Sequence, residues 1–265
     1  MKKILWMLAL LVVAVLACVV VIAPALAKDY QVIRFGTDPT YPPFASKSAD
    51  GSLVGFEIDL GNALCERVQA SCKWVEIDFD GMIPSLNARK IDGILATMAV
   101  TAARQRVIDF SSEVMTTPNA LVFKKGAALD ASLQAVKGKA IGYLQGSTQE
   151  VYAKAVLAKA GAKLVAYPDQ DRAYADLQVG RLDAALQDLV QAELGFLRSP
   201  QGAAFEAGKA IESDLMPGTS AIGILKGNQA LKALLDKGLA QLHADGTYAR
   251  LQKQYFGDLV LYSNK

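Results

Sequence analysis

The sequence predicts an α/β fold in which mainly parallel sheets are flanked by helices. Short runs of β-branched and apolar residues alternate with segments whose apolar residues recur every three to four positions. This alternation is typical of parallel sheets covered by helices on both faces. Near the C-terminus the pattern changes, because two helical segments follow a single late strand. A chain that returns to an earlier sheet would fit, giving two α/β lobes with the first built from both chain ends, although composition alone does not establish that crossing.

The expected elements follow from hydrophobic periodicity. Leu60, Leu64 and Val68 recur at helical spacing, whereas "VIRF" and similar short runs are typical of buried strands. The expected strands are 32–36, 74–77, 93–97, 120–124, 140–144, 163–167, 183–187 and 221–225. The expected helices are 60–68, 82–88, 148–160, 174–180, 189–197, 228–244 and 247–255.

The first 27 residues form an export signal. Lys2 and Lys3 precede an apolar run, and Ala25-Leu26-Ala27 fits a small-x-small cleavage site. We expect cleavage after Ala27 and an exported mature protein. The run is also long enough to span a bilayer, so an uncleaved anchor is an alternative. Cys18 leaves lipoprotein processing open, but the apolar "VVVIA" that follows it is a poor mature N-terminus.

The remaining 238 residues carry no net charge, because loss of Lys2 and Lys3 leaves 26 basic residues against 26 acidic ones. A neutral chain gives no reason to expect nucleic acid or an anionic membrane as a partner. Cys65 and Cys72 would meet an oxidising compartment after export, which favours a disulfide over one buried and one exposed thiol. No histidine lies near them and no CxxC spacing is present, so we expect neither a metal nor a cofactor.

Several loops that follow strands carry side chains suited to a ligand. "GTDPTYPPF" places Asp38 and Tyr41 after the first strand, and "DFDGMIP" places Phe79 after the second. Open α/β sheets bind ligands at this end of their strands. Asp38 also suits an Asx-turn before Pro39, which would be a purely local role.

Three further loops carry charged or capping residues. After the third strand, Thr101 is expected to cap a short helix and Arg104 to follow at its third position, where a guanidinium is mildly disfavoured by the helix dipole unless it binds a carboxylate. "GYLQGSTQE" places Ser147 and Thr148 at a helix N-terminus, which suits an anion or ordinary capping. Asp188 ends a strand, where it would bind an ammonium group or cap the next helix. Together these side chains match a zwitterion with a long, cationic side chain.

Long motifs in one order carry a family resemblance. The segments are "IRFGTDPTYPPF", "GFEIDLGNALCERV", "DFDGMIPSLNARKID", "GYLQGSTQE", "GRLDAALQD" and "DGTYARLQKQYF". Over 28–265 they resemble the polar amino-acid-binding proteins of ABC importers, most closely the lysine/arginine/ornithine- and histidine-binding type. The resemblance implies a type II periplasmic binding fold that closes on its ligand. It implies one lobe from 28–116 and 218–265, a second from 117–217, and a monomer that delivers an amino acid to a membrane permease.

The resemblance also implies residue roles. Arg104 would bind the α-carboxylate with Thr148, Ser147 and the backbone near Thr97, and Asp188 would bind the α-ammonium. Tyr41 and Phe79 would sandwich the side chain and Asp38 would meet its distal charge. Cys65–Cys72 matches the subgroup's disulfide.

One segment departs from the family pattern, because the subgroup's "SSLS" is "ATMA" here. Ala99 lacks a hydroxyl expected near the α-ammonium, and Ala96 lacks one near the ligand side chain. Each lost neutral hydrogen bond costs about 1 kcal/mol. Amino-acid binding should survive these losses, but a neutral amino acid or an opine-like conjugate stays open as the ligand.

Two other classes of function fit less well. Cyclohexadienyl dehydratases share the implied fold, but they place a glutamate acid where this chain has Gln191, which cannot protonate a leaving group. We therefore do not expect an enzyme. A receptor sensor domain would need a segment beyond Lys265.

Overall fold

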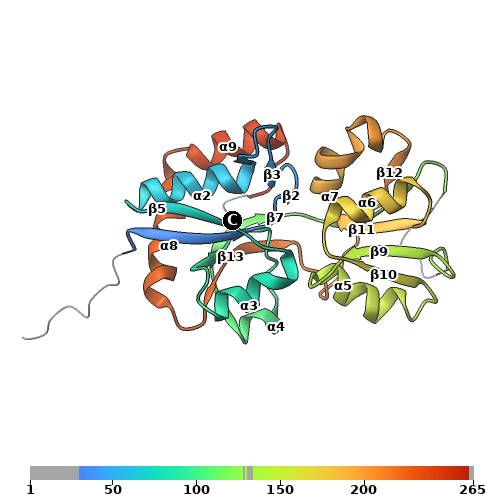
Figure 1. The fold of residues 1–265 in the computed structure, drawn as a ribbon, viewed down its shortest axis with the longest axis horizontal. Coiled ribbons are helices and arrows are strands. Elements are labelled where there is room, and N and C mark those ends of the chain that lie inside the picture. Colours follow the sequence, from blue (N-terminus) through green and yellow to red (C-terminus); the bar gives the residue numbers. More distant parts are fainter. Residues whose placement is uncertain (1–29, 128, 130–133, 263–265) are drawn as a thin grey trace, which may run out of the picture. The chain divides into compact units, whose positions relative to one another are not determined.

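The computed structural model describes residues 30–127, 129 and 134–262, shown in colour in Figure 1. The export signal expected at 1–27 and Cys18 lie outside these residues. Among the helices of the described ranges, none combines the length and apolar character needed to cross a bilayer.

The first lobe is built on a sheet whose strands come from distant parts of the chain. Its order is β5 (Ser71–Glu76), β1 (Val32–Thr37), β6 (Gly93–Ile94), β13 (Thr219–Leu225) and β7 (Ile108–Thr116). Strand β1 pairs in parallel with both β5 and β6, whereas β13 runs antiparallel to β6 and β7. Strand β13 therefore brings the chain back to the first sheet, as the helical C-terminal pattern suggested.

The second lobe repeats this design. Its sheet has the order β10 (Lys163–Tyr167), β9 (Ala140–Leu144), β11 (Ala184–Asp188), β8 (Asn119–Lys124) and β12 (Phe205–Ala207). Strands β10, β9 and β11 are parallel, and β8 runs against β11 and β12. Both sheets are thus mainly parallel with one reversed strand, which confirms the predicted fold class.

Helices and a small third sheet complete the fold (Figure 1). The α-helices are α2 (Phe56–Arg67), α3 (Met82–Asn87), α4 (Ala102–Gln105), α5 (Thr148–Tyr152), α6 (Gln170–Gln178), α7 (Leu189–Gln191), α8 (Gln229–Ala244) and α9 (Thr247–Phe256). Short 3₁₀ helices span Phe79–Gly81 and Pro200–Gly202, and π-helical turns span Ala153–Leu157 and Ala192–Leu197. The third sheet consists of β2 (Thr40–Tyr41), β3 (Ala45–Lys47) and β4 (Leu53–Val54).

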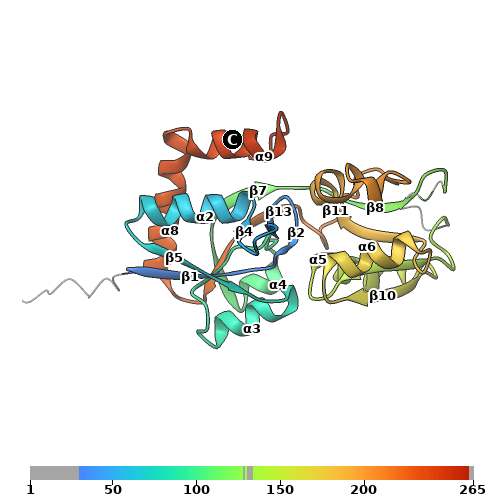
Figure 2. The same cartoon turned by 45° about the horizontal axis from the view of Figure 1, so that its top comes forward.

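Strand alternation sends apolar side chains to both faces of each sheet. In β8, Leu121 and Phe123 pack into one core cluster with Tyr152 of α5, while Val122 between them packs into another with Tyr174 of α6. Successive strand residues point to opposite faces, so this split requires helices on both sides. Figure 2 shows the same layering in the first lobe, with α2 and α9 on one side of β1 and α3 on the other.

Some expected elements differ from the structure. The strand expected at 93–97 ends at Ile94, and Thr97 has a φ of 47°, which no strand accommodates. Strand β7 (Ile108–Thr116) was not predicted, since its buried and exposed residues do not alternate regularly. The helices expected at 148–160 and 189–197 begin as α-helix and continue as π-helical turns.

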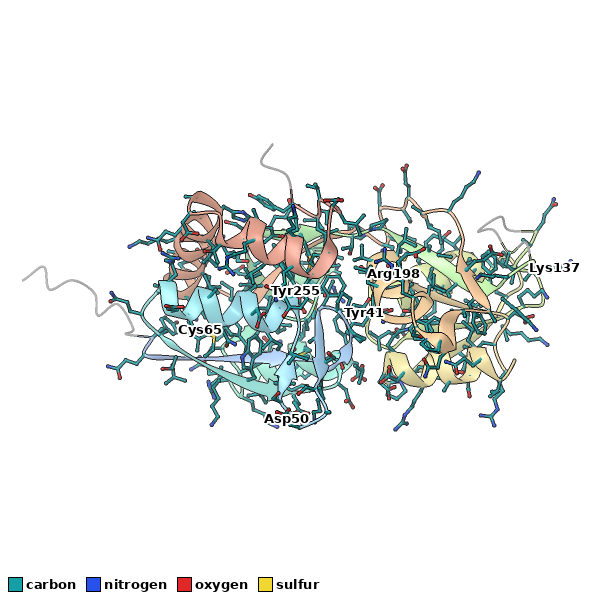
Figure 3. All side chains as sticks on the ribbon, turned by 90° about the horizontal axis from the view of Figure 1, so that it is seen from above. Tyr41, Asp50, Cys65, Lys137, Arg198 and Tyr255 are labelled. Carbon is teal, nitrogen blue, oxygen red and sulfur yellow. A yellow bond between two sulfur atoms is a disulfide. The ribbon has the colours of Figure 1, made fainter. Side chains whose placement is uncertain are left out.

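A disulfide joins Cys65 of α2 to Cys72 of β5, as expected. Figure 3 shows Cys65 on α2 and Tyr255 on α9, which packs beside α2. The Tyr255 hydroxyl donates a hydrogen bond of 2.6 Å to Asp59 of α2. These contacts tie the C-terminal helix and strand β5 to the same helix.

Candidate functional site

The predicted ligand residues come together in one pocket. They lie at or just after the C-terminal ends of β1, β5, β6, β9 and β11, or in the segments that follow those strands. The pocket lining includes all ten of them: Asp38, Tyr41, Phe79, Ala96, Thr97, Ala99, Arg104, Ser147, Thr148 and Asp188. Sheet topology thus gathers side chains that are up to 150 positions apart in the sequence.

Asp38 forms the local turn expected from sequence and also lines the pocket. Its Oδ1 accepts hydrogen bonds from the Thr40 amide at 3.1 Å and from the Thr40 hydroxyl at 2.8 Å, as an Asx-turn requires. The residue is nevertheless buried and lines the pocket. Burial raises the pKa of this carboxyl, and the charges of Asp78 and Asp169 add to the effect. A cation placed beside it would offset that cost.

The two aromatic residues of "GTDPTYPPF" have different roles. Tyr41 lines the pocket, whereas Phe44 is fully buried and packs against Phe256 of α9, with ring centroids 5.4 Å apart. The Tyr41 and Phe44 rings stack at 5.8 Å, which connects the pocket wall to the core. Tyr41 also appears in Figure 3, on the small third sheet.

Arg104 is a buried cation with neutral partners. Thr101 caps α4 by accepting a hydrogen bond from the Arg104 amide, as predicted. Arg104 is only 9% exposed. Its guanidinium donates to the carbonyls of Ala99 at 2.8 Å and Gly146 at 3.1 Å, and lies over the Phe79 ring. Burial lowers its pKa to about 10. A desolvated guanidinium bonded to carbonyls favours an anionic partner.

The "QGSTQE" segment forms an ordinary capped helix start at the pocket wall. The Ser147 hydroxyl accepts from the Glu150 amide at 3.2 Å, and Glu150 accepts from the Gly146 amide at 2.6 Å. The arrangement is close to a capping box, except that Glu150 accepts from the residue before the N-cap Ser147 and not from the N-cap amide itself. Thr148 is buried and lines the pocket, so the capping alternative and a place in the pocket both hold for this segment.

Asp188 also combines capping with a place in the pocket. Its Oδ1 accepts from the Gln191 amide at 2.9 Å, which caps α7, and its Oδ2 accepts from the Thr117 hydroxyl. The residue is 3% exposed, and burial raises the pKa of its carboxyl group to about 6. An ammonium group in the pocket would stabilise the ionised form.

Sequence patterns did not reveal several lining residues, of which Glu57 is the titratable one. Glu57 is the second residue of α2, where an acid is a favourable partner for the helix dipole. In the structure it is buried, and burial raises its pKa to about 7. The other lining residues that were missed are Thr117, Asn119, Leu144, Gln149, Pro217 and Gly218.

Comparison with known proteins agrees with this geometry. Residues 33–258 match the family described as bacterial extracellular solute-binding proteins, family 3. The chain belongs to this family. The match covers both sheets of the structure, so the family assignment and the two-lobed fold rest on the same residues.

Two curated relatives in this family are similar over most of their length. The chain is 45% identical over 236 residues to the lysine/arginine/ornithine-binding periplasmic protein of Escherichia coli K12, covering 88% of this chain and 90% of the relative. It is 42% identical over 234 residues to the histidine-binding periplasmic protein of Salmonella typhimurium, with the same coverage. Both relatives of this family 3 protein are binding proteins.

Among solved structures, the family 3 fold recurs in an ancestral arginine-binding protein bound to arginine. The TM-score is 0.81 at 34% identity, covering 86% of this chain and 99% of that one.

At the position where dehydratases on this fold place an acid, Gln191 is buried and accepts a hydrogen bond of 2.6 Å from the Tyr174 hydroxyl. The side-chain oxygen of Gln191 is therefore hydrogen-bonded to another residue of the second lobe.

Proposed function

We propose that this protein is the periplasmic receptor of an ABC importer and binds an L-amino acid with a cationic side chain. The carrying observation is the charge pattern of one pocket, which is lined by a buried guanidinium and three buried carboxyl groups. The α-carboxylate and α-ammonium groups of an amino acid match Arg104 and Asp188, and Asp38 remains for a positive side chain. The names of the relatives, which include lysine, arginine, ornithine and histidine, support this ligand class.

In this proposal Arg104 binds the α-carboxylate. Its two donated hydrogen bonds to Ala99 and Gly146 fix the plane of the guanidinium, and a fork held in this way suits a carboxylate. Thr148 and Ser147, at the start of α5, and the backbone at Thr97 supply further polar groups in the pocket wall. Lysine at this position would provide a point charge without the same geometry.

Asp188 binds the α-ammonium group. Its carboxylate is held by the Thr117 hydroxyl and the Gln191 amide, so its position is fixed before the ligand arrives. Ala99 supplies no hydroxyl to this end of the ligand. The charge-assisted bond to Asp188 therefore carries most of the ammonium recognition.

Tyr41 and Phe79 hold the ligand side chain, and Asp38 meets its positive tip. Both rings line the pocket, and a planar guanidinium or imidazolium stacks well on such faces. With Ala96 in place of a residue with a hydroxyl, Asp38 is the principal polar contact proposed for the tip.

The remaining parts of the proposal concern export and delivery. We expect cleavage after Ala27 and a monomeric mature protein that uses no cofactor. We assign 28–116 and 218–265 to one lobe and 117–217 to the other, with closure on the ligand and release to a membrane permease. The periplasmic names of the relatives support the compartment.

Two alternatives receive less support. A neutral amino acid would leave Asp38 without a cation in a pocket where burial already raises its pKa, and an opine-like conjugate would add a further carboxylate to a pocket that three carboxyl groups already line. An enzyme of the cyclohexadienyl dehydratase type would need a proton donor where Gln191 is bonded to Tyr174. We therefore propose a binding protein and not an enzyme.

A thermal-shift screen of the mature protein against all amino acids tests the proposal. A ligand that binds only the folded state raises the melting temperature. Arginine, ornithine, lysine or histidine should give the largest rise. A protein that no amino acid stabilises would contradict the proposed function, and a largest rise with a neutral or acidic amino acid would contradict the cationic ligand.

A further inference from the structure

Glu57 makes an unusual contact inside the pocket. Its Oε1 accepts a hydrogen bond of 2.6 Å from the amide of Thr97 and lies 3.3 Å from the Thr97 hydroxyl oxygen. Glu57 is only 1% exposed and belongs to α2, whereas Thr97 belongs to the segment that follows β6. A side chain of one element therefore holds the backbone of another at the point where both line the pocket.

The Thr97 backbone needs such support. Its φ of 47° lies in the left-handed region, which is unfavourable for a β-branched residue. A residue persists in this region only where its surroundings hold it there. On either side of Thr97, backbone hydrogen bonds fix the segment. The Leu95 amide donates to the Gly36 carbonyl, and the Met98 carbonyl accepts from the Ala221 amide. At Thr97 the acceptor is the Glu57 carboxylate instead.

The conformation of Thr97 affects the position of Ala99 in the pocket wall. Ala99 lies two residues further along the chain, and its carbonyl accepts the 2.8 Å hydrogen bond from Arg104. A change of φ at Thr97 would turn the peptide groups on either side of it and move Ala99 relative to Arg104. Such a change would disturb the part of the pocket assigned to the α-carboxylate and α-ammonium groups, which all amino acids share.

We propose that Glu57 is a positioning residue for ligand binding, which holds Thr97 in its left-handed conformation and thereby shapes the wall that receives the amino-acid backbone. This role rests on the proposed function. It requires an acceptor atom and no charge, so glutamine should replace Glu57 better than an apolar residue of similar size. It also differs from a contact with the ligand side chain, which would change the preference among amino acids.

Four variants test the role by titration calorimetry with arginine and glutamine: Glu57→Met, Glu57→Gln, Thr97→Gly, and Thr97→Gly combined with Glu57→Met. Methionine removes the acceptor and keeps the volume. We expect Glu57→Met to lower the affinity for both amino acids by at least about tenfold, and Glu57→Gln to retain more affinity than Glu57→Met. Glycine adopts positive φ without strain. Thr97→Gly has an affinity of its own, which serves as the reference. Adding Glu57→Met to it should therefore lower the affinity by no more than about threefold.

The outcomes separate the possible roles. Equal losses from Glu57→Met in the threonine and glycine backgrounds would overturn the proposal, as would no loss at all. A loss for arginine alone would assign Glu57 to side-chain contact and also overturn it. In urea unfolding of the ligand-free variants, Glu57→Met should likewise lower the free energy of unfolding more in the threonine background than in the glycine background. This comparison tests Glu57 even if the wild type binds no amino acid and the proposed function fails. If Glu57→Met does not fold, hydrogen exchange in the wild type decides, because an unprotected Thr97 amide contradicts the contact.

Discussion

The guanidinium of Arg104 joins two segments of the pocket wall, because it donates to the carbonyl of Ala99 and also to the carbonyl of Gly146, which is 42 positions after Arg104. Ala99 follows a strand of the first sheet, and Gly146 follows a strand of the second. One buried cation thus lies where residues of both lobes meet.

Loss of this side chain should be the most damaging single change for binding. Charge-assisted hydrogen bonds contribute about 1.5–3 kcal/mol each, so Arg104→Ala should lose most affinity for every amino acid while the fold persists. Calorimetry measures the affinity and circular dichroism the fold. Arg106→Ala, an exposed residue at the end of the same helix, is the matched control. Unchanged affinity in Arg104→Ala would contradict the carboxylate assignment.

The disulfide should affect stability and leave recognition alone. Cys65 and Cys72 belong to α2 and β5, and neither lines the pocket. Replacing both with serine should lower the free energy of unfolding by about 2–3 kcal/mol, measured by urea denaturation. Ligand preference should stay the same. Two reactive thiols in the exported wild-type protein would show that the bond does not form there.

Closure should depend on a close approach between Gly195 and Pro42. A Cβ atom added at Gly195 would lie 2.3 Å from the Pro42 carbonyl oxygen, which forces the two segments apart. Overpacking of this kind costs about 1–3 kcal/mol. Gly195→Ala should therefore lower the affinity for every amino acid by about tenfold without changing the order of preference among them. Calorimetry measures the affinities, and thermal unfolding of the ligand-free protein is the control. Equal affinity in the variant would show that binding does not require this approach.

The stability of the ligand-free protein should depend on pH through Glu57. Burial raises its pKa from 4.5 to about 7, so the protonated form is favoured in the folded state. The stabilisation from this group is complete below about pH 4.5 and is lost as the pH rises through about 7. Nearby Asp188 and Asp38 carry negative charge that raises the pKa of Glu57 further.

Urea unfolding at pH values from about 4.5 to 8 measures this effect in the wild type and in Glu57→Gln. The wild type should lose stability relative to the variant as the pH rises, because glutamine does not titrate. The comparison cancels the acidic groups that do not interact with Glu57, and Asp188, whose pKa is also raised, titrates in both proteins. A constant difference between the two proteins across this range would contradict a buried, titrating Glu57.

The sequence was sufficient to predict most of the sheets and much of the pocket. Residues at strand ends, such as Asp38 and Asp188, were identified because parallel sheets gather these positions. The N-cap role of Thr101 was also predicted, because threonine often precedes the first turn of a helix. The strand and helix order also follows from local periodicity, which requires no knowledge of distant contacts.

Other features depend on distant contacts that local patterns do not reveal. Glu57 has the sequence pattern of an acid in a first helical turn, and its place in the pocket depends on how α2 packs beside the segment after β6. A left-handed Thr97 contradicts its own propensity and is held by that contact. Thr117 and Asn119 lie where the chain passes from β7 to β8, so their position depends on two sheets at once.

Under the proposed function, Asp38 should decide whether the receptor prefers a cationic side chain. Its Oδ1 holds the Thr40 loop, and in the described part of the chain no hydrogen bond uses Oδ2, which is therefore assigned to the ligand. Asp38→Asn keeps the loop acceptor and removes the charge. The preference for arginine over glutamine should then narrow by at least about tenfold, near 1.4 kcal/mol. Asp50→Asn, an exposed acid that accepts from the Ser48 hydroxyl in a nearby turn, is the matched control.

Calorimetric titration of the wild-type mature protein with arginine, ornithine and glutamine tests the central claim most directly. A receptor for cationic amino acids should bind arginine or ornithine more tightly than glutamine, and Asp38→Asn should reduce that difference. A wild type that prefers glutamine or glutamate, or a variant that keeps the full preference, would contradict cationic specificity. Failure to bind any of the amino acids would contradict the receptor itself.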